Sequence, residues 1–125
     1  MIKLLIFMKR KPGLSRQEFI DYYENNHIVL IAKHFGEFQA DYRRSYPEEA
    51  APFGLTGVAD SQEDAKAGVE FDVLTEIWLK DRATMDAMFA KNAQPDVAAE
   101  VAADEENFVD RASVRFYISE EHPRR

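Results

Sequence analysis

Apolar residues follow a helical spacing from Ser15 to His34. At 100° per residue, one narrow face of this segment collects Phe19, Tyr23, His27, Leu30 and His34. Ser15 and Glu18 have the spacing of a capping box, so a helix begins there and is expected to end near Gly36. His27 lies in the middle of the predicted core face. Because burying an unpaired polar group costs about 1–3 kcal/mol, we expect His27 either to have a partner or to line a cavity.

Four further segments have the pattern of strands, at residues 1–10, 38–46, 69–80 and 111–119. The first and the third carry apolar side chains at both parities. Two helices separate the last two strands, one at 81–91 capped by Asp81 and one that begins at Pro95. In the second of these, Val97, Val101 and Phe108 are expected to face inward. Its acidic residues are predicted to form a solvated outer side: Glu100, Asp104, Glu105 and Glu106.

This order of elements predicts an α+β fold of the ferredoxin-like βαββαβ type, with a four-stranded antiparallel sheet and helices on one face. The first and third strands need cover on the other face as well, and no helix remains to supply it. An apolar sheet face in water marks an interface. We therefore expect a homodimer in which two sheets pair face to face into a dimeric α/β barrel.

The chain of 125 residues is one domain, assigned to 1–119, followed by a flexible tail at 120–125. Residues 47–68 have no lasting periodicity and are predicted to be a long loop that acts as a lid.

Charge and composition argue against several classes of partner and site. The net charge of −7 argues against nucleic acid and against membrane surfaces as partners. The chain has no cysteine, which removes disulfides and thiolate sites and fits a cytoplasmic location. His34 lies seven residues from His27, about 10 Å along a helix, so the two cannot share a metal ion. No nucleotide-binding loop or fingerprint is present, and we expect no metal and no cofactor.

Two stretches of the sequence resemble a known family. They are IKLLIFMKRKPGLSRQEFIDYYENNH, whose helix contains Y-x-x-x-H, and FDVLTEIWLKD with its E-x-W. Together they resemble the EthD-like branch of the dimeric α/β-barrel superfamily, which includes polyketide cyclases and dehydratases, cofactor-free monooxygenases and methylmuconolactone isomerases. The resemblance implies a homodimer with one pocket per subunit between helices and sheet. It also implies a pocket histidine at His27 and a tyrosine on the second strand, for which Tyr42 is the nearest match.

Three residues are the catalytic candidates. His27 would transfer a proton; the alternative is a core histidine held by a carboxylate or a backbone carbonyl. Tyr42 would hold a proton at a carbonyl or enolate oxygen, or would simply fill the core. Asp72 would orient His27 or act as a second base, unless it is a turn residue or an interface ion pair. Asp72 lies on the same strand face as Glu76 and Trp78, and the sequence does not decide whether that face meets the helices or the partner subunit. The expected substrate-binding residues are Tyr23, His34, Phe38, Arg44 and Trp78.

We therefore expect a cofactor-free enzyme of catabolism or secondary metabolism that isomerises, dehydrates or cyclises a cyclic or aromatic carbonyl compound. Its partner would be a small hydrophobic or aromatic molecule bound between the first helix and the sheet. Two alternatives stay open. One is a non-catalytic dimer that binds a hydrophobic metabolite or assists an oxygenase, and the other is a cofactor-free or haem-using monooxygenase on the same scaffold.

Overall fold

A computed structural model describes residues 1–48 and 70–125, so most of the predicted lid at 47–68 lies outside the described residues. The described residues form ten elements in chain order: β1 (Ile2–Arg10), α1 (Arg16–Tyr22), the π-helical turn η1 (Tyr23–His27), α2 (Ile28–Phe35), the 3-10 turn η2 (Gly36–Phe38), β2 (Gln39–Ser45), β3 (Val73–Leu79), α4 (Arg82–Asn92), α5 (Pro95–Glu105) and β4 (Val109–Ser119).

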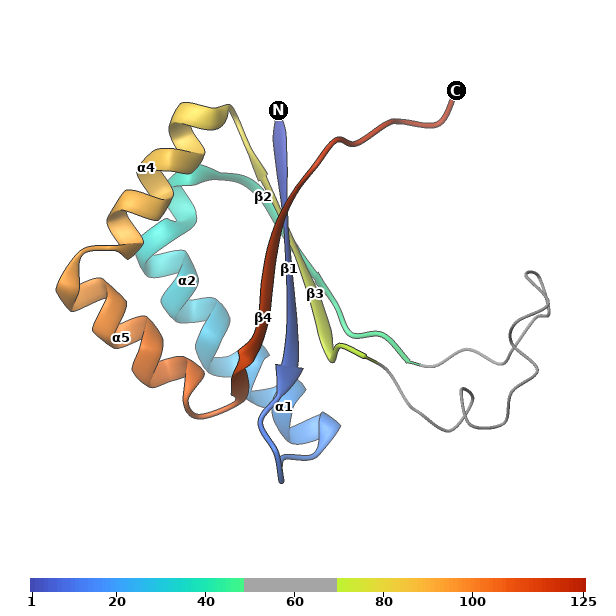
Figure 1. Ribbon diagram of the computed structural model, residues 1–125, viewed down its shortest axis with the longest axis vertical. Helices are drawn as coiled ribbons and strands as arrows, with labels where there is room; N and C mark the ends of the chain where they lie inside the picture. The colour runs from blue at the N-terminus through green and yellow to red at the C-terminus, as the bar shows by residue number, and fades with distance from the viewer. Residues whose placement is uncertain (49–69) are drawn as a thin grey trace.

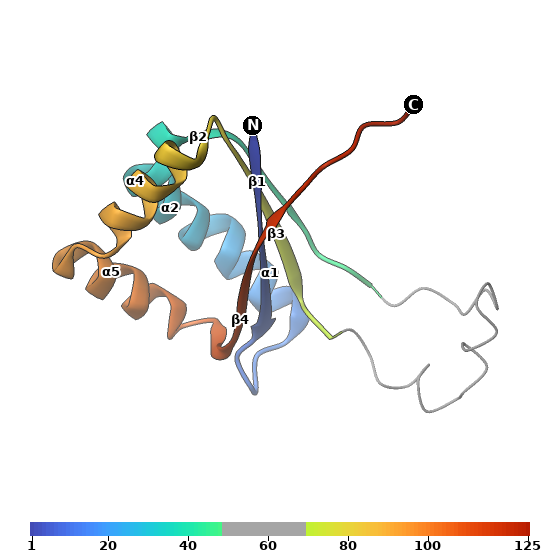
Figure 2. The same cartoon turned by 45° about the horizontal axis from the view of Figure 1, so that its top comes forward.

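The four strands form one antiparallel sheet in the order β2-β3-β1-β4. All the helices lie on the same side of this sheet, and the opposite face carries no helix (Figures 1 and 2). The predicted α+β ferredoxin-like fold is confirmed. Face-to-face pairing of two sheets stays a prediction.

Alternation along the two central strands decides which side chains meet the helices. Leu4, Ile6 and Met8 of β1 are buried beneath the helices, and so are Val73, Thr75, Ile77 and Leu79 of β3. The residues between them point to the open face. That face carries the ring of Phe7, which contacts Phe71 and Tyr117 at centroid distances of 4.9 and 5.9 Å.

The first helix begins as the sequence predicts but does not continue as one regular helix. Ser15 and Glu18 form the complete capping box. The π-helical turn η1 then adds to the spacing of the inward positions, because a π turn takes one more residue than an α turn. The buried residues are Phe19, Tyr23, His27 and Phe35. Leu30 packs against the core as expected, but Ile31 and Phe35 line the pocket, whereas Leu30 and His34 do not.

The helices of the second half begin as expected. Asp81 accepts a hydrogen bond from the backbone N–H of Thr84 at 2.8 Å and so caps α4. Pro95 is the first residue of α5, and Val97 and Val101 are buried. Within the part of the chain that is described, no helix has the length and apolar character needed to cross a bilayer.

Candidate functional site

A pocket lies between the helices and the covered face of the sheet, with a cavity volume of about 100 Å³. A closed cavity of about 150 Å³ is known to hold benzene, so this one is on the scale of a single small ring. Its walls are mostly apolar. The polar lining residues are Tyr23, His27, Gln39, Tyr42, Thr75, Asn92 and Glu105.

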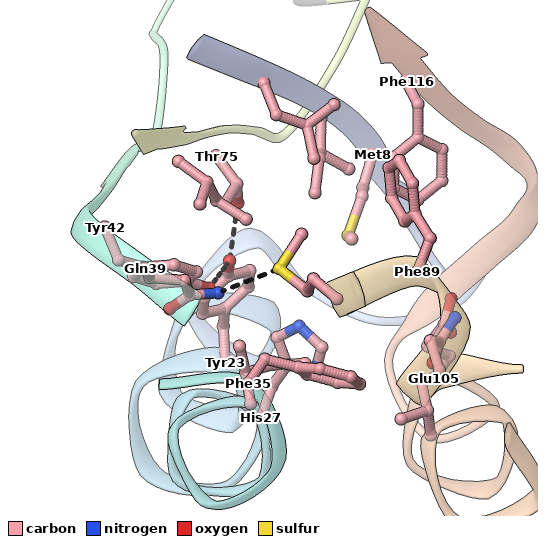
Figure 3. Close-up of a pocket in the computed structure, with 17 residues that line it drawn as sticks. Met8, Tyr23, His27, Phe35, Gln39, Tyr42, Thr75, Phe89, Glu105 and Phe116 are labelled. Carbon is pink, nitrogen blue, oxygen red and sulfur yellow. Dashed lines mark hydrogen bonds between the residues drawn. The ribbon is translucent and has the colours of Figure 1, made fainter. Parts of the chain in front are cut away.

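The imidazole of His27 enters the pocket from the helix side, whereas Thr75 comes from the sheet (Figure 3). Nδ1 of His27 lies 2.6 Å from Oδ2 of Asp104, a residue of α5. Both side chains are largely shielded from solvent, with exposed fractions of 5% for His27 and 9% for Asp104. The ring also contacts Tyr23 and Phe108, at centroid distances of 4.7 and 4.9 Å. Packing and the carboxylate together fix its orientation.

Asp104 determines which nitrogen of His27 carries the proton. One of its oxygens accepts a hydrogen bond from the hydroxyl of Tyr22 at 3.0 Å, and the other faces Nδ1 of His27. A carboxylate only accepts hydrogen bonds, so Nδ1 donates and the neutral ring keeps its lone pair on Nε2. Among the described residues, no side chain forms a hydrogen bond to Nε2. The pocket therefore presents a free base held in place by a carboxylate.

Three hydroxyl groups gather in the same pocket, and we call them the hydroxyl cluster: Tyr23, Tyr42 and Thr75. The Tyr23 oxygen lies 2.5 Å from Oγ1 of Thr75 and also hydrogen-bonds the hydroxyl of Tyr42. Hydroxyl hydrogens rotate to suit their partners, so an O–H of this cluster can turn to donate to a ligand oxygen. Burial raises the pKa of Tyr23 and of Tyr42 above the usual tyrosine range. The hydroxyl cluster is thus a neutral hydrogen-bond donor at physiological pH.

The EthD domain matches residues 11–112. The chain belongs to the EthD family. Proteins of this family are typically dimeric. No curated protein matches the chain significantly.

Three solved structures similar to this EthD-family chain have its fold. An Arabidopsis thaliana protein aligns with a TM-score of 0.60 at 11% identity, over 100% of this chain and 99% of its own. An EthD family protein from Bacillus halodurans aligns with a TM-score of 0.60 at 19% identity, covering 98% of this chain and 100% of its own. HapK from Hahella chejuensis gives a TM-score of 0.56 at 13% identity, covering 98% of this chain and 93% of its own. Identities this low establish the fold of the EthD-family chain and nothing about its reaction.

Of the eight predicted site residues, the structure brings Tyr23, His27 and Tyr42 together in the pocket. Asp72 is not among the lining residues. It lies just before β3, where its carboxylate accepts a hydrogen bond from the backbone N–H of Arg10 at 2.8 Å. The role of orienting His27, expected of Asp72, is taken by Asp104.

Trp78 and Glu76 lie on the open face of the sheet, away from the helices. The sequence had not decided between the two faces for these residues. The Trp78 ring has Lys3 and Arg43 over it, at 4.8 and 5.4 Å. Its indole N–H donates to Glu121 at 3.0 Å, so the predicted flexible tail contacts the sheet at this point.

The other three expected substrate-binding residues have protein partners outside the pocket lining. His34 hydrogen-bonds Glu100 through Nε2 at 2.8 Å, and that bond holds the pKa of the Glu100 carboxyl below its usual value. Arg44 forms a two-pronged ion pair with Glu24, at 2.6 and 2.5 Å. Phe38 lies in η2 with the Lys91 ammonium 5.9 Å from its ring centre.

The sequence pattern predicts a solvated side for the acidic stretch of α5 and so misses two residues of the candidate site. That assignment is wrong for Asp104, which is buried against His27, and for Glu105, which lines the pocket. The signal was present in the spacing. At 100° per residue, Asp104 lies about 60° from the buried Val101, at the edge of the inward face of α5. An acidic residue in that position needs a partner, as His27 does.

In residues 1–48 and 70–125, no three His, Cys, Asp or Glu side chains gather closely enough to hold a metal ion. His27 and His34 each face a separate carboxylate on α5.

Proposed function

We propose that this EthD-family protein is an enzyme that moves a proton on a small cyclic or aromatic carbonyl compound, without a cofactor. The proposal rests on one observation. Asp104 holds Nδ1 of His27 at 2.6 Å and leaves the lone pair of Nε2 facing an apolar pocket. A histidine needed only for packing would have both nitrogens satisfied or covered.

In the proposed reaction, the substrate oxygen accepts a hydrogen bond from an O–H of the hydroxyl cluster. Nε2 of His27 removes a proton from the carbon next to the carbonyl, and the electron pair moves toward the oxygen to form an enol or enolate. The hydroxyl cluster stabilises the negative charge that develops there. Asp104 stabilises the imidazolium that forms when His27 takes up the proton. Isomerisation, dehydration and cyclisation all begin with this step.

The apolar walls of the pocket favour a neutral ring over a charged metabolite, because they offer little to replace the hydration of an ion. Arg44 is neutralised by Glu24, whose pKa is lowered mainly by the hydrogen bonds from that guanidinium.

We further propose that the protein works as a homodimer. The open face of the sheet exposes a mixed apolar surface that includes Leu5, Phe7, Leu74 and Trp78. Pairing of two such faces would remove this surface from water. Family membership supports the same arrangement.

The test uses the β,γ-unsaturated isomer of cyclohexenone, a small ring whose protons next to the carbonyl exchange when a base removes them. Exchange for deuterium in heavy water is followed by proton NMR. The wild type should accelerate exchange, and His27→Ala should reduce the rate to that of buffer. The control is His122→Ala, because His122 also pairs with a carboxylate, Glu120 at 2.7 Å, but lies in the tail. Ligand binding without exchange would instead favour the non-catalytic alternative, and exchange by His27→Ala at the wild-type rate would refute the role of His27.

A further inference from the structure

Glu105 is a second ionisable group of the pocket that the reaction above does not use. It is the last residue of α5 and follows Asp104 directly. Its side chain lines the pocket and is partly buried, whereas its neighbour Glu106 is exposed and lies 3.5 Å from Arg111. Among the described residues, no hydrogen bond engages the Glu105 carboxyl. A partly buried carboxyl that borders a pocket without a partner is available to a ligand.

The surroundings of Glu105 favour its protonated form. Burial raises the pKa of the Glu105 carboxyl, and the negative charge of Asp104 raises it further. Two positive groups oppose this effect, Arg111 on β4 and His27 when it is charged. The Glu105 carboxyl is therefore a weaker acid than an exposed glutamate, and it borders the same pocket as His27.

The polar groups are arranged in a definite order across the pocket. In the view of Figure 3, Tyr42 and the rest of the hydroxyl cluster lie on one side, Glu105 lies on the other, and His27 lies between them. A substrate whose oxygen is held by the hydroxyl cluster has the neighbouring carbon at His27. Atoms further along the same substrate then reach Glu105.

We propose that Glu105 is the acid that returns a proton to the far carbon of the substrate, and that the substrate is therefore a β,γ-unsaturated carbonyl compound. This inference rests on the proposed function, and specifies its reaction as an allylic proton shift.

The step balances without a further reactant. His27 removes the α proton, and the α C–H electrons form a double bond between the carbonyl carbon and the α carbon. The carbonyl π electrons move to the oxygen, which stays hydrogen-bonded to Tyr42 and its partners, so that a dienol or dienolate forms with the β,γ double bond still in place. The O–H bond of Glu105 then breaks as a C–H bond forms at the γ carbon, and the carbonyl re-forms with a conjugated double bond. His27 is left protonated and Glu105 ionised. Proton exchange with water returns both to their starting states.

The electrostatic interaction between His27 and Glu105 favours one order of the two proton transfers. The positive charge on His27, once it has accepted the proton, lowers the pKa of Glu105. Proton uptake by the base thus promotes proton release by the acid. The opposite order is disfavoured, because before His27 is charged Glu105 holds its proton more tightly.

The experiment separates the two half-reactions on the same compound, the β,γ-unsaturated isomer of cyclohexenone. Deuterium exchange next to the carbonyl measures proton removal by His27. The rise in ultraviolet absorbance of the conjugated isomer measures the complete reaction. The variants are Glu105→Gln, which keeps the size of the side chain but has no acidic proton, and Glu106→Gln as the control from the next position.

We expect Glu105→Gln to reduce the conversion by about 100-fold or more, the usual effect of losing a general acid, while exchange continues near the wild-type rate. Glu106→Gln should leave both rates unchanged. The pH profile of conversion, but not that of exchange, should lose its high-pH decline in Glu105→Gln. Unchanged conversion in Glu105→Gln would refute the inference alone, and so would an equal loss of exchange and conversion. Failure of the wild type to catalyse exchange would refute the proposed function and the inference with it.

Discussion

Replacing Asp104 with asparagine tests the hydrogen bond on which the site depends, with almost no change in side-chain volume. The amide oxygen of asparagine can still accept the hydrogen bond from Tyr22, which lies 3.0 Å from Oδ1 in the wild type. Its NH₂ group then faces Nδ1 of His27. Two donors cannot share a hydrogen bond, so the imidazole must move its proton to Nε2. Nε2 then has no lone pair to offer to the pocket.

The expected loss of stability is modest, because one hydrogen bond is weakened and not lost. Hydrogen bonds to a charged group contribute about 1.5–3 kcal/mol and neutral ones about 0.5–1.5 kcal/mol, so the free energy of unfolding should fall by about 1–1.5 kcal/mol. For a domain of this size, that corresponds to a decrease of about 3–7 °C in the unfolding midpoint. The burial of both partners, 5% and 9% exposed, justifies the use of these values without a reduction for solvent screening.

The loss of activity should be much larger than the loss of stability. With the proton on Nε2, the exchange rate should fall by about 100-fold to 10,000-fold, the range usual for loss of a general base. Nitrogen-15 NMR of the histidines should report the changed tautomer directly. Glu100→Gln is the control, since Glu100 pairs with His34 at 2.8 Å on the same two helices but is more exposed. It should retain the wild-type rate. An Asp104→Asn protein that exchanges at the wild-type rate, with its proton still on Nδ1, would show that our account of the dyad is wrong.

Three further predictions concern other parts of the molecule. Tyr42→Phe keeps the ring but removes one hydroxyl of the hydroxyl cluster, and exchange should slow by about 100-fold if that group stabilises the developing oxyanion; equal rates would remove Tyr42 from the site. Because burial raises the pKa of Glu105, the ionised form destabilises the fold as pH rises through that pKa, so Glu105→Gln should unfold at a higher temperature than the wild type near pH 8 and the difference should shrink near pH 4. Phe7→Glu places a charge on the open sheet face and should convert a dimer into a monomer in analytical ultracentrifugation; an unchanged mass would place the interface elsewhere.

The sequence alone determined the order of the elements and the inward position of His27. Both follow from local rules: the capping box of Ser15 and Glu18 begins the helix, and helical spacing from Phe19 through Tyr23 places the imidazole on the buried side. The order of the elements likewise predicted helices on one face of the sheet only, as the structure has it (Figure 1). Apolar residues at both parities of the central strands predict a cover for the other face, and that cover stays a prediction.

Only the tertiary structure decided the partners of these residues. Strand alternation predicts that Asp72, Glu76 and Trp78 lie on the same face of the sheet, but it does not tell which face the helices cover. The sequence therefore could not decide whether Trp78 reaches the pocket. The π-helical turn at Tyr23–His27 was not predicted either, and beyond it Ile31 and Phe35, and not Leu30 and His34, line the pocket.

The choice of Asp104 over Asp72 as the partner of His27 is the clearest case. The two bonded residues are 77 positions apart in the chain, and their contact exists only because α5 packs beside the first helical segment. Helical spacing could have placed Asp104 on an inward face, as it did for His27. It could not have placed the two faces opposite each other, because the packing of helices on a sheet depends on every side chain between them.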